Sequence, residues 1–213
     1  RLPEDPEHVL VMRNDRKRYY LDVYRMNVYT GKFFRVLAQP GPVTNWAVDN
    51  NGVVRMATMQ DENSLSYETQ IMYRDNEDSE WVEVDRFEGM QNSWSSLGFT
   101  EDNKKIYVTS NLGRDTYALS IFDPETGGLE DLFENEGTDV TRIGMTEDGE
   151  VITILYNDID TKPKRHYVNS KWESILENLT TAFGVDYVGV ASMSKDQQKM
   201  ILSIGDDRNP GDY

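Results

Sequence analysis

The sequence predicts an all-β protein, a β-propeller fragment of about four to five four-stranded antiparallel blades. Three observations lead to this fold class. Apolar and aromatic residues are spread along all 213 residues instead of being gathered in blocks. A hairpin-forming pattern recurs at intervals of about fifty residues, and segments with helical periodicity are nearly absent.

The recurring pattern is a small or polar residue, then a large apolar residue, and a turn-forming Asp three positions after it. It occurs four times, at Asn45–Asp49, Gly98–Asp102, Gly144–Asp148 and Ser192–Asp196. The four Asp residues are 53, 46 and 48 positions apart, which fits a propeller blade and is too long for a leucine-rich or ankyrin repeat. After each Asp the chain turns and becomes apolar again, and Asn51-Gly52 and Asp148-Gly149 tolerate the positive φ of a tight hairpin.

A second hairpin is predicted in each interval, because a four-stranded blade needs two. The four candidates run from Tyr24 to Phe34, turning at Thr30-Gly31; from Thr69 to Val84, turning within Asp75–Asp78; from Tyr117 to Leu132, turning around Asp123-Pro124 and Thr126–Gly128; and from Lys164 to Leu176, turning near Asn169-Ser170. Residues Lys171 to Thr180 also have apolar residues at helical spacing. Trp172, however, follows a polar turn as Trp81 does in its own unit, so a strand is predicted there.

These repeats divide the chain into a single, partial propeller domain, residues 1–213. The expected blades are residues 1–42 (incomplete), 43–91, 92–140, 141–185 and 186–213 (incomplete). Each blade buries both faces against its neighbours, so an interrupted arc exposes an apolar face at each end. Such an arc is expected to close on itself, to self-associate through exposed blade edges, or to be marginally stable. The first residue is not Met, which suggests that upstream sequence has been removed.

The charge argues against two classes of partner. With 38 acidic and 22 basic residues the formal net charge is −16, and this field repels phosphate backbones and anionic lipids. No nucleic acid and no membrane partner is expected. The acidity is interpreted as a source of solubility, with an acidic binding surface as the alternative. A soluble protein of the cytoplasm or the periplasm fits, because no apolar run spans a membrane and the opening residues are no signal peptide.

The motifs of the common hydrolase and nucleotide sites are missing. The chain has no Gly-x-Ser-x-Gly segment, no glycine-rich phosphate loop and no cysteine. Its two histidines, His8 and His166, are assigned structural or exposed positions. No catalytic residue, cofactor site or metal site is therefore predicted.

Two short motifs are considered and set aside. Asn157 and the segment Asp158–Asp160 offer the oxygen ligands that calcium accepts, but lack the Gly and the distal Glu of an EF-hand loop. The segment Asn178–Thr180 fits a glycosylation acceptor, a pattern so short that it arises readily by chance.

Several short sequence segments, called phrases, resemble segments of one protein family. They are Asn14-Asp15-Arg16 with Leu21-Asp22-Val23-Tyr24-Arg25 and Thr30-Gly31; Trp46-Ala47-Val48-Asp49 with Gly52-Val53-Val54-Arg55; Ser110–Asp115 leading into Ala118-Leu119; and Gly205-Asp206-Asp207 with Pro210–Tyr213. Their order is similar to that of the N-terminal propeller of prolyl oligopeptidase family serine peptidases, in the branch of the dipeptidyl and acylaminoacyl peptidases. The resemblance implies a C-terminal α/β-hydrolase domain in the parent chain, capped and gated by this propeller, and short peptides as substrates.

The resemblance also bears on two residues. Arg114 and Asp115 fall in a propeller phrase, and they are expected to fix the blade through an ion pair or a turn hydrogen bond, with substrate contact as the alternative. The chain alone is not expected to be an enzyme. It lacks the paired-glutamate phrase with which some dipeptidyl peptidases hold a substrate's amino terminus. The alternative function is a stand-alone propeller that binds protein or carbohydrate partners.

Overall fold

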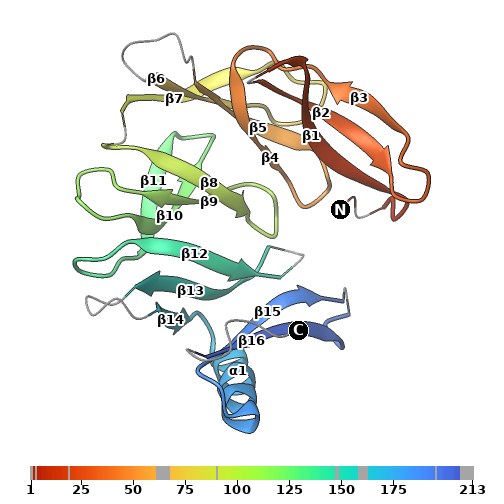
Figure 1. The fold of residues 1–213 in the computed structure, drawn as a ribbon. Coiled ribbons are helices and arrows are strands. Elements are labelled where there is room, and N and C mark those ends of the chain that lie inside the picture. Colours follow the sequence, from red (N-terminus) through yellow and green to blue (C-terminus); the bar gives the residue numbers. More distant parts are fainter. Residues whose placement is uncertain are drawn as a thin grey trace. The chain divides into compact units, whose positions relative to one another are not determined.

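The computed structural model describes residues 2, 4–18, 20–60, 68–89, 91–146, 149–157, 163–194 and 196–206. The chain divides into two compact units, Arg1–Phe133 and Glu134–Tyr213. In the described residues, antiparallel strands that follow one another in sequence form five sheets (Figure 1).

The first unit contains three of these sheets. One has three strands, β1 (His8–Lys17), β2 (Tyr20–Asn27) and β3 (Phe33–Leu37). The next has four, β4 (Val43–Val48), β5 (Val54–Gln60), β6 (Glu68–Tyr73) and β7 (Val82–Glu88). The third also has four, β8 (Trp94–Phe99), β9 (Ile106–Ser110), β10 (Ala118–Asp123) and β11 (Gly128–Phe133).

The second unit contains two smaller sheets and a helix. Its three-stranded sheet consists of β12 (Val140–Met145), β13 (Val151–Asn157) and β14 (Pro163–Tyr167). Helix α1 (Ser170–Phe183) follows β14. The last two strands, β15 (Tyr187–Met193) and β16 (Met200–Gly205), pair with each other.

Seven of the eight predicted hairpins are present, and the all-β prediction is confirmed. The turns of the recurring pattern, called corners, join β4 to β5, β8 to β9, β12 to β13 and β15 to β16. The second hairpins join β2 to β3, β6 to β7 and β10 to β11. Glycines at the predicted turns have the positive φ that these hairpins need, for example +84° at Gly52 and +89° at Gly149.

The eighth predicted hairpin, from Lys164 to Leu176, is wrong in its second half. Residues Ser170–Phe183 are helical. Asn169 caps the first turn, because its side-chain oxygen accepts a hydrogen bond from the Trp172 backbone N–H at 3.0 Å. Gly184, at φ +64°, ends the helix in the left-handed conformation. Trp172 and Leu176 point the same way and are buried, so the helical spacing was the correct signal.

Each unit has its own buried apolar clusters. In the first unit, Trp94 stacks on Phe122 with ring centroids 4.7 Å apart, in a cluster that also includes Met56 and Ile71 from the preceding sheet. A second cluster joins Val23 of β2 to Trp46 of β4. The clusters between sheets show how one blade shelters the apolar side of the next.

Candidate functional site

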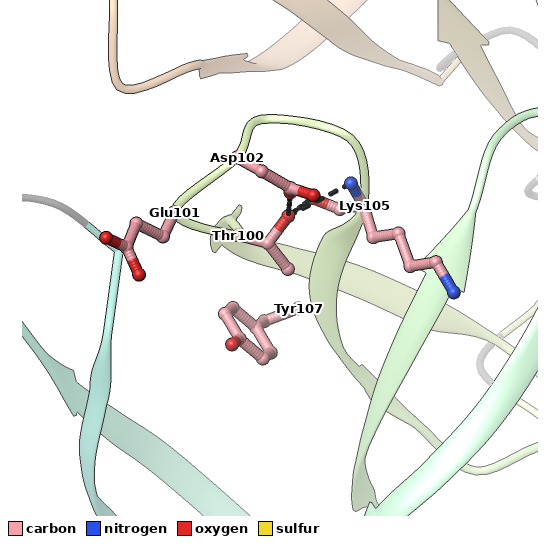
Figure 2. Close-up of a pocket in the computed structure, with 5 residues that line it drawn as sticks. All are labelled: Thr100, Glu101, Asp102, Lys105 and Tyr107. Carbon is pink, nitrogen blue, oxygen red and sulfur yellow. Dashed lines mark hydrogen bonds between the residues drawn. The ribbon is translucent and has the colours of Figure 1, made fainter.

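A pocket of about 560 Å³ lies at the corner between β8 and β9 (Figure 2). Its lining residues are Thr100, Glu101, Asp102, Lys105 and Tyr107. Carboxylates, an ammonium group and two hydroxyls are thus close together in sequence. The geometry of these groups decides whether they form a reactive site.

The Thr100 hydroxyl is fully engaged in building the turn. It donates to Asp102 Oδ1 at 2.7 Å and accepts from the Lys105 backbone N–H at 3.1 Å. Asp102 Oδ1 also accepts from the Lys104 backbone N–H at 3.0 Å. The Thr100 hydrogen bond, followed by the Lys104 N–H, holds the pKa of Asp102 below its ordinary value. A carboxylate so stabilised is a weak base, and the hydroxyl bonded to it is not activated as a nucleophile.

The charged side chains of this corner diverge. In Figure 2 the Glu101 carboxylate and the Lys105 ammonium group point away from each other and from the hydroxyl of Thr100. Lys105 Nζ lies 3.5 Å from a carboxylate oxygen of Asp123, at the end of β10. These groups do not converge on a point where a substrate atom could react.

The same turn recurs in the other unit, which identifies it as a feature of the fold. Ser194 donates to Asp196 Oδ1 at 2.6 Å and accepts from the Lys199 backbone N–H at 2.9 Å. The pKa of Asp196 is lowered for the same first cause, the hydroxyl hydrogen bond from Ser194. The predicted role of this Asp as the turn-former is therefore right at positions 102 and 196, while Asp148 lies outside the described residues.

The backbone hydrogen bonds also correct the alignment of the repeats. The residues that open the four corners are Asp49, Thr100, Thr146 and Ser194, because each donates its N–H across the turn to residue 53, 105, 150 or 199. They are 51, 46 and 48 positions apart. In the first corner Asp49 alone accepts from the N–H groups of Asn51 and Val53, so it replaces both the hydroxyl and the later Asp.

Two corners of the first unit are fastened to each other. Asn50 donates its N–H to Asn103 Oδ1 and its side-chain amide to the Thr100 carbonyl, both at 2.8 Å. Arg55 donates to the Asn103 carbonyl at 2.7 Å and lies 3.5 Å from Asp49 Oδ2. Arg55 is buried, so these polar contacts hold consecutive sheets together.

Arg114 and Asp115 lie in the connection between β9 and β10. Arg114 forms an ion pair with Asp131 of β11, and the Ser120 hydroxyl donates to the same carboxylate at 2.6 Å. Burial raises the pKa of Asp131, but the hydrogen bonds from Ser120 and Arg114 outweigh it and leave the pKa lowered. Asp115 is exposed. The predicted roles of both residues, blade fixing or substrate contact, stay predictions.

The two histidines are placed differently. His8 Nδ1 is 2.9 Å from Asp5 Oδ2, and its other ring nitrogen is 3.5 Å from the Asn27 amide. The His8 hydrogen bond, followed by that of Arg25, lowers the pKa of Asp5 to about 2. In the part of the chain that the structure describes, no serine or threonine hydroxyl has a hydrogen bond to His8. His166 is exposed in β14, where it pairs with Ile154.

A buried carboxylate that the sequence analysis did not single out is Asp22 of β2. Its side chain is 1% exposed, and Arg16 binds it through two nitrogen atoms at 2.9 and 3.0 Å. The Gln39 N–H adds a hydrogen bond at 3.0 Å. The Arg16 hydrogen bond is the largest cause that lowers the pKa of Asp22. Both residues belong to the first phrase that resembles the peptidase family. That resemblance was the sequence signal that could have identified them.

The remaining motifs give no site. Among the described residues no cluster of three or more histidine and carboxylate side chains is arranged to hold a metal ion. The segment Asp158–Asp160 of the calcium-like motif lies outside them. Asn178 is exposed on α1. No helix in the described ranges has both the length and the apolar character needed to cross a membrane.

Comparisons with known proteins support the architecture alone. No family model matches the chain, and no curated protein matches it. Among solved structures, the crystal structure of TolB from Acinetobacter baumannii is similar, with a TM-score of 0.51 and 14% sequence identity. The alignment covers 96% of this chain and 50% of the TolB chain, so this chain spans about half of that protein's length. The chain therefore has a propeller-like, all-β fold built from consecutive antiparallel sheets.

Proposed function

We propose that this chain is the non-catalytic propeller region of a serine peptidase of the prolyl oligopeptidase family. In this proposal an α/β-hydrolase domain of the same parent chain carries the catalytic triad. The propeller caps that domain's active site and admits short peptides. The propeller-like fold supports the proposal, and so does the resemblance of the phrases quoted above.

The observation that carries the proposal is the order of those phrases on consecutive sheets. The first phrase lies on β1 and β2, the second on β4 and β5, and the third runs from β9 to β10. Each contains a buried polar residue that fixes its sheet: Asp22 in the first, Arg55 in the second, and Asn111, which accepts from the Ser93 N–H at 2.7 Å, in the third. The end of the fourth phrase, residues 207–213, lies outside the described residues.

The proposed gating is a size filter. Sheets held by buried polar contacts and interlocked cores do not open readily, so a substrate must fit the space that the propeller leaves beside the hydrolase domain. The cap is expected to contribute little to the chemical step. Its removal or loosening should change which peptide lengths are cleaved more than the rate for the shortest ones.

The first test is the parent reading frame. It should continue beyond Tyr213 into a Gly-x-Ser-x-Gly segment, with Asp and His following in that order. A fluorophosphonate probe should label the serine of the purified parent protein and leave the 213-residue chain unlabelled. A reading frame without such a domain would overturn the proposal and favour the stand-alone binding module.

The second test measures the filter. Peptides of increasing length that share one cleavable bond should be hydrolysed by the parent protein with kcat/KM falling sharply beyond a threshold length. A parent variant Arg55→Gln, which loses contacts between the two corners, should accept longer peptides, while Glu125→Gln, an exposed change in the same unit, should leave the threshold unchanged. Equal kcat/KM values for all lengths would contradict gating.

A further inference from the structure

A cavity of about 340 Å³ lies inside the second unit. Strands β12, β13 and β14, helix α1 and strands β15 and β16 all contribute to its wall. A volume of this size is at the lower end of the range of small-molecule sites in proteins. The described residues of its lining fall between Arg142 and Ser203.

The charge of the cavity is opposite to that of the chain. Among the described residues, its lining includes two arginines, Arg142 and Arg165, and no Asp or Glu. The chain as a whole carries a formal net charge of −16. Two guanidinium groups in an acidic protein form a local positive site that selects for an anion.

Arg165 is held in place by its neighbours. One guanidinium nitrogen donates to the Val188 carbonyl at 2.6 Å. The guanidinium carbon lies 4.8 Å from the centre of the Tyr187 ring and 5.8 Å from that of Tyr167. Within the part of the chain that the structure describes, neither Arg165 nor Arg142 has a carboxylate within ion-pair distance. Arg165 therefore keeps further N–H donors for a planar anion.

Three hydroxyl side chains line the same cavity: Thr153, Tyr187 and Ser203. Tyr187 lies over Gly189, since a Cβ at position 189 would collide with the Tyr187 hydroxyl. Gly144 leaves similar room, because a Cβ there would lie 2.6 Å from Thr153 Oγ1. The two glycines thus make space for hydroxyl groups beside the arginines.

The rest of the wall is mainly apolar and includes Leu155, Leu176 and Val190. An inorganic anion would gain nothing from such walls, whereas an anion with an aliphatic group would bury it. We propose that this cavity binds a small organic carboxylate that carries an apolar group. The carboxylate meets Arg165 and Arg142, and the apolar group packs against the leucine side chains. This inference does not depend on the proposed function.

The test is a calorimetric titration of the complete 213-residue chain with matched probes. N-acetyl-leucine supplies the carboxylate and the aliphatic group, and N-acetyl-leucinamide has the same shape without the charge. Binding of the amide should be at least about tenfold weaker, the size expected for losing a charged hydrogen bond. The tripeptide Ala-Ala-Leu distinguishes a peptide C-terminus from a free organic acid as the source of the carboxylate. Tighter binding than that of N-acetyl-leucine indicates a peptide C-terminus, and weaker binding indicates a free acid.

Variants locate the binding to the cavity. Arg142→Gln, an exposed change on β12, should weaken N-acetyl-leucine binding several-fold. Lys199→Gln removes the same charge from an exposed residue of this unit outside the cavity lining, and should have no effect. Thr153→Val removes a hydroxyl and keeps the volume of the wall, so it provides a second test of the cavity if Arg142→Gln reduces the folded fraction. Far-UV circular dichroism monitors that fraction.

Three outcomes would overturn the inference. One is the absence of binding by both N-acetyl-leucine and the tripeptide. Another is equal affinity for the amide or for inorganic phosphate, which would remove the role of the charge or of the apolar walls. The third is an equal loss of affinity in Arg142→Gln and Lys199→Gln, because binding would then lie elsewhere on the surface.

Discussion

Strand β7 in the first unit and helix α1 in the second follow the third strand of their respective sheets, yet they have different secondary structure. Each has a tryptophan near its start that comes shortly after a polar turn: Trp81 directly precedes β7, and Trp172 is the third residue of α1. Trp81 is partly buried against the cluster around Trp46, with the two ring centroids 5.6 Å apart. Trp172 is 2% exposed, in a cluster with Leu176 and Val188. An equivalent position in a repeat therefore does not fix the secondary structure.

Local chemistry explains the difference. After Trp81 the chain reads Val82-Glu83-Val84-Asp85, an alternation of β-branched and charged residues that suits a strand with one covered face. After Trp172 it reads Glu173-Ser174-Ile175-Leu176, between an Asn cap and a Gly end. The two helix caps and the apolar stripe together favour a helix here, although the repeat predicts a strand.

The largest expected effect is that of Trp172→Ala. It removes the largest side chain of the buried cluster in the second unit and leaves a cavity, which should lower the free energy of unfolding by about 3–5 kcal/mol. Trp81→Ala should cost less, because Trp81 is only partly buried. Urea denaturation followed by far-UV circular dichroism measures both. Equal losses would mean that the two tryptophans carry the same packing role.

The two regions also show what could be predicted from sequence. The corners were predictable because their turn chemistry is local: Asp102 and Asp196 bond to residues no more than two positions away. The helix could have been predicted from Asn169, Gly184 and the apolar spacing, had these local signals been weighted above the period. The Arg16–Asp22 pair and the cavity at Arg165 depend on side chains that meet across strands. Sequence spacing does not specify such contacts.

The next effect concerns the first unit. Asp22→Asn replaces the buried acceptor of Arg16 and should lower the free energy of unfolding by about 2 kcal/mol at neutral pH. Folding lowers the pKa of Asp22 from its ordinary value of 3.8, so its contribution is present above that value and is lost as the pH falls through the folded-state pKa. The difference between the wild type and Asp22→Asn should therefore shrink in acid.

Glu125→Gln is the matched control for this prediction. It removes the same charge from an exposed position of the same unit, and its unfolding curve should follow that of the wild type from neutral to acidic pH. Denaturation curves at several pH values compare the three proteins. A difference for Asp22→Asn that stays constant into acid would contradict the ion pair as the source of the stability.

A smaller effect is expected at the helix cap. Asn169→Ala removes the acceptor for the Trp172 N–H and should lower the free energy of unfolding by about 1 kcal/mol. Asn169→Ser loses the amide that donates to Glu150 Oε1 at 2.9 Å. Because it keeps an oxygen that can accept at the cap, it should retain most of the stability. A loss in Asn169→Ser as large as in Asn169→Ala would assign the effect to the Glu150 contact instead of the cap.

The smallest effect is predicted for Trp172→Phe. The Trp172 indole N–H is buried, and no hydrogen-bond acceptor reaches it in the part of the chain that the structure describes. Folding takes this N–H away from water without giving it an acceptor, so its removal in Trp172→Phe is favourable. This favourable term offsets part of the packing that the smaller ring loses. With that offset, the free energy of unfolding should change by less than about 1 kcal/mol, far less than for Trp172→Ala. A loss in Trp172→Phe as large as in Trp172→Ala would show that the indole N–H is bonded in solution, and the buried aromatic ring alone would then not explain why this segment packs as a helix.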